Sequence, residues 1–306
     1  MTLFQSIVLG LVQGVAEFLP ISSSGHLLLA QRLLGLEDVP LLFDVILHLP
    51  SLLAVCIFFR KKIARLFAIL FRWIFRKSPI ASARESAVES LPAAKWSEAT
   101  YNDMDTLAGS DALGRKTIVA VIVTTFVTGV IGILTSKFLD GIPTKAIFCG
   151  FLFTAALLFA SGFLRRASEK KNNGGAEQAQ GAAAKGLSLA QAAFIGFMQG
   201  VGTLPGVSRS GSTISGALFC GVDRSAAGEY SFIVSIPAIL AAFVLEFRHV
   251  ERMSGVSAVN LAAACAVCFA AAYASLALLM RLVKKGRLEW FAAYLIPLGI
   301  VGLILL

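Results

Sequence analysis

The amino-acid sequence predicts an all-α polytopic membrane protein with two re-entrant helical hairpins arranged in inverted-topology repeats. Of its 306 residues, 57% are hydrophobic and only 15% are charged, and the mean hydropathy is +0.80. Soluble domains carry about 25% charged residues, so this composition favours a chain that places much of its surface in lipid. Six long apolar runs and an internal repeat with polar turns complete the prediction.

The six apolar runs predict six transmembrane helices, because a span needs about 20 apolar residues. They lie at 41–60, 117–137, 143–164, 228–247, 257–280 and 288–306. The N-terminal stretch is also apolar, but it lacks a basic region and is interrupted by Glu17, so we expect no cleaved signal peptide. Cys265 and Cys268 have the spacing of a metal pair, but they lie among alanines, which favours helix packing.

Two polar stretches repeat at a constant offset of 186 positions. LGLVQGVAEFLPISSSGH begins at Leu9, and IGFMQGVGTLPGVSRSGS begins at Ile195. In each, an apolar run meets a turn rich in serine, glycine and proline and then resumes, which predicts two half-helices at 3–36 and two at 187–221. Irregular backbone is tolerated at membrane depth only inside protein or along a wet cavity. We therefore expect two re-entrant hairpins.

Each hairpin is followed by three spans, which divides the chain into repeats 1–164 and 187–306 with a linker at 165–186. An odd number of spans inverts the second repeat. Lysines and arginines follow the first, third and fifth spans, and the positive-inside rule places these loops in the cytoplasm. The hairpins then enter from opposite faces, and their tips can meet.

An insertion at 62–116 belongs to the same cytoplasmic side. It begins with IARLFAILFRWIF, a basic amphipathic stretch that we expect on the inner membrane surface. The net charge of +9 comes from cations clustered at the ends of apolar runs. It therefore reflects membrane orientation and does not indicate binding of nucleic acid.

The two hairpin turns differ at the positions where chemistry is expected. The mismatched pairs are Glu17 with Thr203, Ser23 with Arg209, and His26 with Ser212. An ionisable residue inside a membrane segment costs at least about 2.5–3.5 kcal/mol, so it is a functional candidate by default. A structural salt bridge between the hairpins is the alternative, but it would not require the surrounding serines and glycines. Divided chemistry on a duplicated scaffold predicts one site between the halves.

The turns are suited to binding a phosphate. Arg209 offers a planar fork that matches phosphate oxygens, and the amides that open the following half-helix attract an anion. The residues predicted to surround the phosphoryl group are Ser22, Ser24, Gly25, Ser208, Ser210, Gly211 and Thr213.

The first turn also offers catalytic groups. His26 can attack phosphorus or act as a general acid and base, and Ser23 is the alternative nucleophile. Glu17 could orient the imidazole, take a proton or help hold a divalent cation, with Gln13 one helical turn earlier on the same face. For His48, inside a span, we expect packing or a hydrogen bond to a neighbour.

QGVAEFLPISSSGH and LPGVSRSGST resemble the two signature regions of the bacterial undecaprenyl-diphosphate phosphatase family, the bacitracin-resistance type. The resemblance covers nearly the whole chain apart from 62–116 and 167–186. It implies an inner-membrane enzyme, open to the periplasm, that removes the terminal phosphate of a C55 polyprenyl diphosphate. The product is the lipid carrier of peptidoglycan synthesis, and its recycling confers resistance to bacitracin.

The resemblance also implies the members of the site. Carried over by motif, they are Glu17, Ser22, Ser23, Ser24, His26, Ser208 and Arg209. The family uses a divalent cation, Mg²⁺ or Ca²⁺, and allows Glu or Gln at the position of Gln13. Because Gln lacks a charge, we expect the substrate diphosphate to share in holding the cation.

Another class of function uses the same features. Inverted repeats with broken helices are also a transporter architecture, so a polyprenyl-phosphate flippase is the alternative prediction. The expected partners are the lipid substrate and the membrane, and the sequence leaves a homodimer open.

Overall fold

The computed structural model describes residues 1–36, 39, 41–75, 107–136, 143–171, 186–247 and 256–305. Within these residues the chain forms helices and no strand, which confirms the all-α prediction. In chain order the helices are α1 (Leu3–Phe18), α2 (Ser23–Leu33), α3 (Leu41–Phe58), α4 (Arg60–Ile74), α7 (Asp111–Ser136), α8 (Thr144–Lys171), α10 (Leu189–Val201), α11 (Arg209–Phe219), α12 (Arg224–Phe247), α13 (Ala258–Lys284) and α14 (Glu289–Leu305). Most of the insertion 62–116 and of the linker 165–186 lies outside the described residues.

Among the described residues, four helical segments are long and apolar enough to cross a membrane. They are Asp111–Thr135, Thr144–Leu164, Arg224–Leu245 and Ala258–Lys284. The pair α3 and α4 passes the same test together but bends by 79° between its two parts, and α14 is a shorter apolar helix. The chain is thus a multi-pass membrane protein with four or five spans by this measure, and the six-span arrangement stays a prediction.

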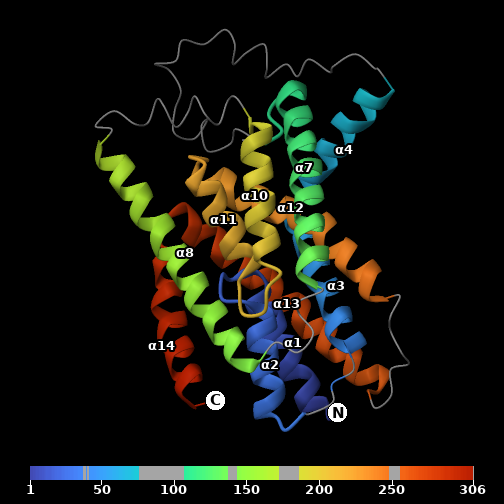
Figure 1. Ribbon diagram of the computed structural model, residues 1–306. Coiled ribbons are helices and arrows are strands. Elements are labelled where there is room, and N and C mark those ends of the chain that lie inside the picture. Colours follow the sequence, from blue (N-terminus) through green and yellow to red (C-terminus); the bar gives the residue numbers. More distant parts are fainter. Residues whose placement is uncertain are drawn as a thin grey trace.

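The two repeated stretches form two helical hairpins, α1–α2 and α10–α11. They enter the bundle from opposite ends, and their turns lie near its middle (Figure 1). Both begin with the same capping box, made by Thr2 with Gln5 and by Ser188 with Gln191. Both glutamines also donate to the end of the second half-helix, to the carbonyl of Leu34 and of Cys220. The duplication therefore extends to the hydrogen bonds that close each hairpin.

Each hairpin packs against a long helix of the other half of the chain. The first lies against α13 and the second against α7. A Cβ atom on Gly10 would lie 2.3 Å from the carbonyl oxygen of Ala264, and one on Gly196 would lie 2.7 Å from that of Thr124. The hairpin backbones approach these helices so closely because glycine leaves room for them.

The helices α3 and α12 complete the surroundings of the turns. They contact one another and each contains an internal proline, Pro50 in α3 and Pro237 in α12. A proline inside a helix removes one backbone hydrogen bond and bends the axis. These two helices form the wall beside which the hairpin turns meet.

Candidate active site

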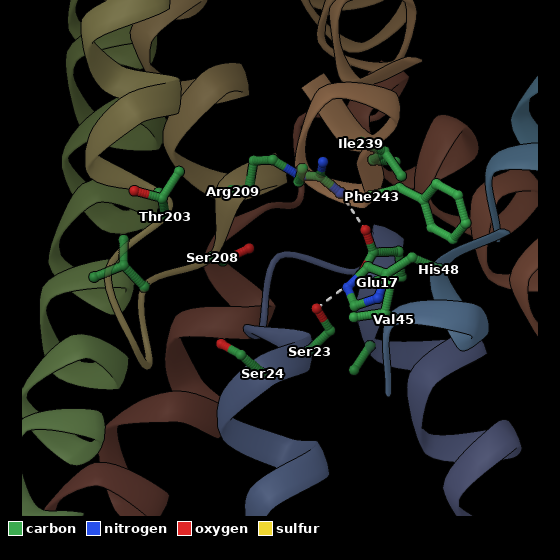
Figure 2. Close-up of a pocket in the computed structure, with 14 residues that line it drawn as sticks. Glu17, Ser23, Ser24, Val45, His48, Thr203, Ser208, Arg209, Ile239 and Phe243 are labelled. Atoms are coloured by element: carbon green, nitrogen blue, oxygen red, sulfur yellow. Dashed lines mark hydrogen bonds and ion pairs between the residues drawn. The ribbon is translucent and has the colours of Figure 1, made fainter. Parts of the chain in front are cut away.

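A cavity of about 290 Å³ lies where the two hairpin turns meet α3 and α12 (Figure 2). Most of its polar lining comes from the two hairpins: Glu17, Ser23 and Ser24 from the first, and Thr203, Ser208 and Arg209 from the second. The remaining wall is mostly apolar and includes Val45, Ile239, Ala242 and Phe243. The two turns thus meet as predicted, and the cavity between them has one polar and one apolar side.

Glu17, at the end of α1, is the centre of the polar side. Its side chain is 1% exposed, and its Oε1 atom is paired with the guanidinium of Arg209. Its Oε2 atom accepts hydrogen bonds from Gln13 Nε2 at 3.0 Å and from Ser23 Oγ at 2.8 Å. Burying an unpaired carboxylate would be very costly, so these donors allow the charge to remain inside the protein.

Arg209 reaches Glu17 from the first residue of α11. The helix is capped by Ser208, whose hydroxyl accepts a hydrogen bond from the amide of Gly211 at 3.1 Å. Thr213 donates its hydroxyl to the carbonyl of Arg209 one turn later. The cap fixes the start of the helix and therefore the point from which the guanidinium extends across the cavity (Figure 2).

The turn before Ser23 has an unusual backbone conformation. Among the described residues, Ser22 is the only one other than glycine with a positive φ, at 72°. A conformation of this kind costs about 1–3 kcal/mol and is often kept at functional sites. It places Ser23 as the first residue of α2, with its hydroxyl directed at the Glu17 carboxylate.

His26 lies on α2 but does not line the cavity. Its Nδ1 donates to the carbonyl of Ser22 at 2.9 Å, which leaves Nε2 to accept from the hydroxyl of Tyr294, also at 2.9 Å. The ring also contacts the rings of Phe151 and Tyr294, with centroids 5.2 and 5.7 Å away. His26 therefore supports the backbone of the Ser22 turn instead of facing the space beside Arg209.

The other predicted phosphate-binding residues divide into two groups. Ser24 and Ser208 line the cavity, whereas Ser210 and Thr213 line a second pocket with room for about one water molecule. Ser22 and Gly211 are buried and line neither of these two spaces. Gly25 packs against α8, where a Cβ atom would lie 2.5 Å from the ring of Phe151. Gly25 thus lets the hairpin turn approach its neighbours.

His48 of α3 lines the cavity, although the sequence indicated only packing or a hydrogen bond for it. Its Nε2 atom lies 3.8 Å from Glu17 Oε2, and its Nδ1 donates to the carbonyl of Asp44 at 2.9 Å. The expected hydrogen bond to a neighbour is therefore present, but the ring also faces the site. The repeat contained a signal, since His48 aligns with Ser235, which lines the small pocket that Glu17 also borders.

Comparison with known proteins identifies the family. The model of the bacitracin resistance protein BacA matches residues 6–301. The chain belongs to the BacA family. It is 43% identical to an undecaprenyl-diphosphatase of Treponema denticola over 301 residues, which cover 98% of this chain and 96% of the relative.

More distant BacA relatives carry the same description. Undecaprenyl-diphosphatases of Desulfosudis oleivorans and Methanobrevibacter smithii are 35% and 33% identical, and the matches cover 98% of this chain in both cases. They cover 97% and 96% of those relatives. The family predicted from the paired motifs is thereby confirmed.

The divalent cation expected for a BacA chain does not fit the donors that surround Glu17. Both carboxylate oxygens already accept from cationic or neutral donors. Gln13 presents its amide nitrogen to Glu17, which leaves its buried Oε1 without a hydrogen-bond partner. In the part of the chain that the structure describes, no three His, Cys, Asp or Glu side chains are grouped as metal ligands. As arranged, the Glu17 carboxylate binds the guanidinium of Arg209 in place of a metal ion.

Proposed function

We propose that the protein is an undecaprenyl-diphosphatase that hydrolyses the terminal phosphate of a polyprenyl diphosphate. The regenerated carrier would serve peptidoglycan synthesis, and its recycling would confer resistance to bacitracin. One observation carries the proposal: a hydroxyl bound to a buried carboxylate, at Ser23 and Glu17, shares a cavity with Arg209 from the other hairpin. The names of the relatives agree with this chemistry.

The two sides of the cavity match the two parts of such a lipid. Ser24, Ser208 and Arg209 offer donors to the diphosphate. The apolar wall from α3 and α12, with Val45 and Phe243, would receive the first part of the polyprenyl chain. The tail would then continue between helices into the bilayer.

Ser23 is the nucleophile in this proposal. Its hydroxyl already donates to Glu17 Oε2, which is the arrangement of a nucleophile with its general base. Binding of the diphosphate would draw the guanidinium of Arg209 onto the phosphoryl oxygens and release Glu17 Oε1. With its ion pair loosened, the carboxylate becomes a stronger base for the proton of Ser23.

The bonds then change in two steps. Ser23 Oγ attacks the terminal phosphorus while Glu17 takes its proton, and the bond from phosphorus to the bridging oxygen breaks. The proton on Glu17 passes to the leaving bridging oxygen, so the polyprenyl monophosphate leaves, Glu17 is ionised again, and a phosphoserine remains. Water, deprotonated by Glu17, releases inorganic phosphate and returns a proton to Ser23. Arg209 stabilises the charge on the equatorial oxygens in both steps.

His26 was the other predicted nucleophile, and its contacts favour a different role. Both ring nitrogens have partners in Ser22 and Tyr294. We therefore assign His26 as a positioning residue that acts through the carbonyl of Ser22. No step of the reaction is assigned to a cation held by the protein, and we expect Mg²⁺ or Ca²⁺ to enter on the diphosphate and neutralise part of its charge.

We propose the membrane arrangement along with the function. Repeats 1–164 and 187–306 would each hold a re-entrant hairpin and three spans, with the cavity open to the periplasm. The opposite entry of the hairpins and their matching capping boxes support inverted repeats (Figure 1). Labelling of single cysteines introduced beside the cavity mouth, from outside sealed spheroplasts, tests the orientation.

The flippase remains an alternative use of the same cavity, but no observation favours it over hydrolysis. Release of phosphate from a polyprenyl diphosphate in detergent separates the two functions, because a micelle has no two compartments between which a lipid could be transported. The nucleophile is tested by trapping the phosphorylated enzyme and locating the phosphate by peptide mapping. We expect it on Ser23 and not on His26. Phosphate found on His26 would rule out Ser23 as the nucleophile. If the wild type released no phosphate, the proposed hydrolysis would be wrong.

A further inference from the structure

The helix α4 carries an exposed apolar face that lies away from the cavity. Phe67, Phe71 and Ile74 are 65%, 52% and 64% exposed. Their spacing of four and three residues places them on one face of the helix. Ile69, on the opposite face of the helix, is buried against Gly114 of α7. The apolar surface of α4 is therefore divided between the protein and something outside it.

Specific contacts fix the rotation of α4. The guanidinium of Arg72 donates two hydrogen bonds to the carboxylate of Asp111, at 2.6 and 3.1 Å, and Arg65 donates to the carbonyl of Gly109. Together with the packing of Ile69, these contacts hold one side of the helix on the start of α7. The face with Phe67 and Phe71 then points outward and cannot turn into the protein.

The position and charge of α4 indicate what covers this face. The helix follows the apolar helix α3 with only Phe59 between them, and the two bend by 79°. It thus starts at the end of a membrane-embedded helix and turns aside from it (Figure 1). Arg60 and Lys61 at its start are exposed. Arg60, seven residues before Phe67, continues the apolar face at its start, and Lys61 lies beside that face. An apolar face flanked by cations is typical of helices at the surface of a bilayer that contains anionic lipid.

We propose that α4 is an interfacial helix that binds anionic phospholipids. Its face with Phe67, Phe71 and Ile74 inserts at the surface of the same bilayer that the long helices cross, and Arg60 and Lys61 bind the lipid phosphates. This inference does not depend on the reaction in the cavity. It assigns a lipid-binding role to a segment outside the repeated hairpins.

The first experiment measures the depth of this face with a tryptophan probe. In the full chain, Trp73, Trp96 and Trp290 are replaced by phenylalanine, and either Phe71→Trp or, on an exposed polar side of the same helix, Ala68→Trp is added. Both proteins are placed in nanodiscs of phosphatidylcholine and phosphatidylglycerol in equal parts. We expect brominated acyl chains to quench the probe of Phe71→Trp, and aqueous iodide to quench that of Ala68→Trp.

Two other outcomes would overturn the insertion. If iodide quenched both probes equally, the face would lie in water. If neither quencher reached the probe of Phe71→Trp, a protein segment would cover the face in place of lipid. Phosphatase activity measured in detergent checks that each variant is folded, since none of these residues lines the cavity.

The second experiment tests the charge. Brominated phosphatidylglycerol should quench the probe of Phe71→Trp more strongly than brominated phosphatidylcholine does. Adding Arg60→Gln and Lys61→Gln should lower this preference about fivefold for each charge removed. The matched control removes two exposed cations from the end of α13, with Lys284→Gln and Lys285→Gln, and should leave the preference unchanged. Equal quenching by both lipids in the parent protein would overturn the selectivity for anionic lipid.

Discussion

Replacement of Arg209 by alanine would separate its structural contribution from its catalytic one. The Glu17 side chain is 1% exposed, and in the part of the chain that the structure describes Arg209 is the only lysine or arginine paired with it, while the imidazole of His48 lies 3.8 Å away. Removal of one partner from a buried ion pair costs about 3–5 kcal/mol. Because Gln13 and Ser23 still donate to Oε2, we expect a loss near the lower end, about 3 kcal/mol.

Turnover should fall by a separate mechanism. Arg209→Ala removes the cation that faces the phosphoryl group, and loss of one such preorganised donor lowers kcat about 10²–10³-fold. The assays are release of inorganic phosphate from a polyprenyl diphosphate in detergent and unfolding of the same protein in mixed micelles. Arg209→Lys, which keeps the charge but lacks the planar fork, should recover most of the stability and only part of the turnover.

The double variant Glu17→Gln with Arg209→Ala provides the decisive control. Without the buried charge, stability should return to within about 1 kcal/mol of the wild type, while turnover stays low because both groups are missing. Restored turnover in this variant would mean that Arg209 serves only to neutralise Glu17. Wild-type stability and turnover in Arg209→Ala would refute both parts of the reasoning.

Three further predictions concern other parts of the site. Ser23→Ala should lower phosphate release at least about 1,000-fold, whereas Ser24→Ala should stay within about tenfold; equal losses would argue against Ser23 as the nucleophile. Gly206→Ala, at a φ of 80° and with the added Cβ against the carbonyl of Ile147, should destabilise the protein in micelle unfolding by at least the roughly 1–3 kcal/mol that the strained φ alone costs. Gly129→Ala, with nothing near the added Cβ, should stabilise it by up to about 1 kcal/mol. Equal changes in stability for the two variants would contradict the steric restriction at Gly206. Gln13→Glu should bind Mg²⁺ or Ca²⁺ without substrate in calorimetric titration, where the wild type should not; binding by the wild type would restore a resident cation site.

Much of the fold could be predicted because the duplication preserves local hydrogen bonds. The shared capping boxes at Thr2 and Ser188 hold equivalent half-helices. The ends of the long helices were harder to place. The helix that contains the span predicted at 117–137 begins earlier, at Asp111, whose carboxylate is held by Arg72 of α4. A hydropathy pattern contains no information about such a contact.

In the site, too, features set by the aligned turns could be predicted, whereas features set by contacts with distant residues could not. The aligned turns predicted that Glu17 and Arg209 would share one region, and they form an ion pair. The orientations of the two histidines could not be predicted from the sequence alone. The direction of the His26 ring depends on Tyr294, 268 positions away. His48 faces the cavity because α3 passes beside the hairpin turns. Sequence spacing does not fix either relationship.

The exchange of packing partners explains why the site belongs to both halves. The hairpin that carries Glu17 is held by α13, through the close approach at Gly10 and a hydrogen bond of 2.9 Å from Ser275 to the carbonyl of Gly14. The hairpin that carries Arg209 is held by α7 in the equivalent way. Each half thus positions the functional side chain of the other. Because each hairpin packs mainly against the other half, divergence of the two turns could divide the chemistry while both copies kept the glycines on which their packing depends.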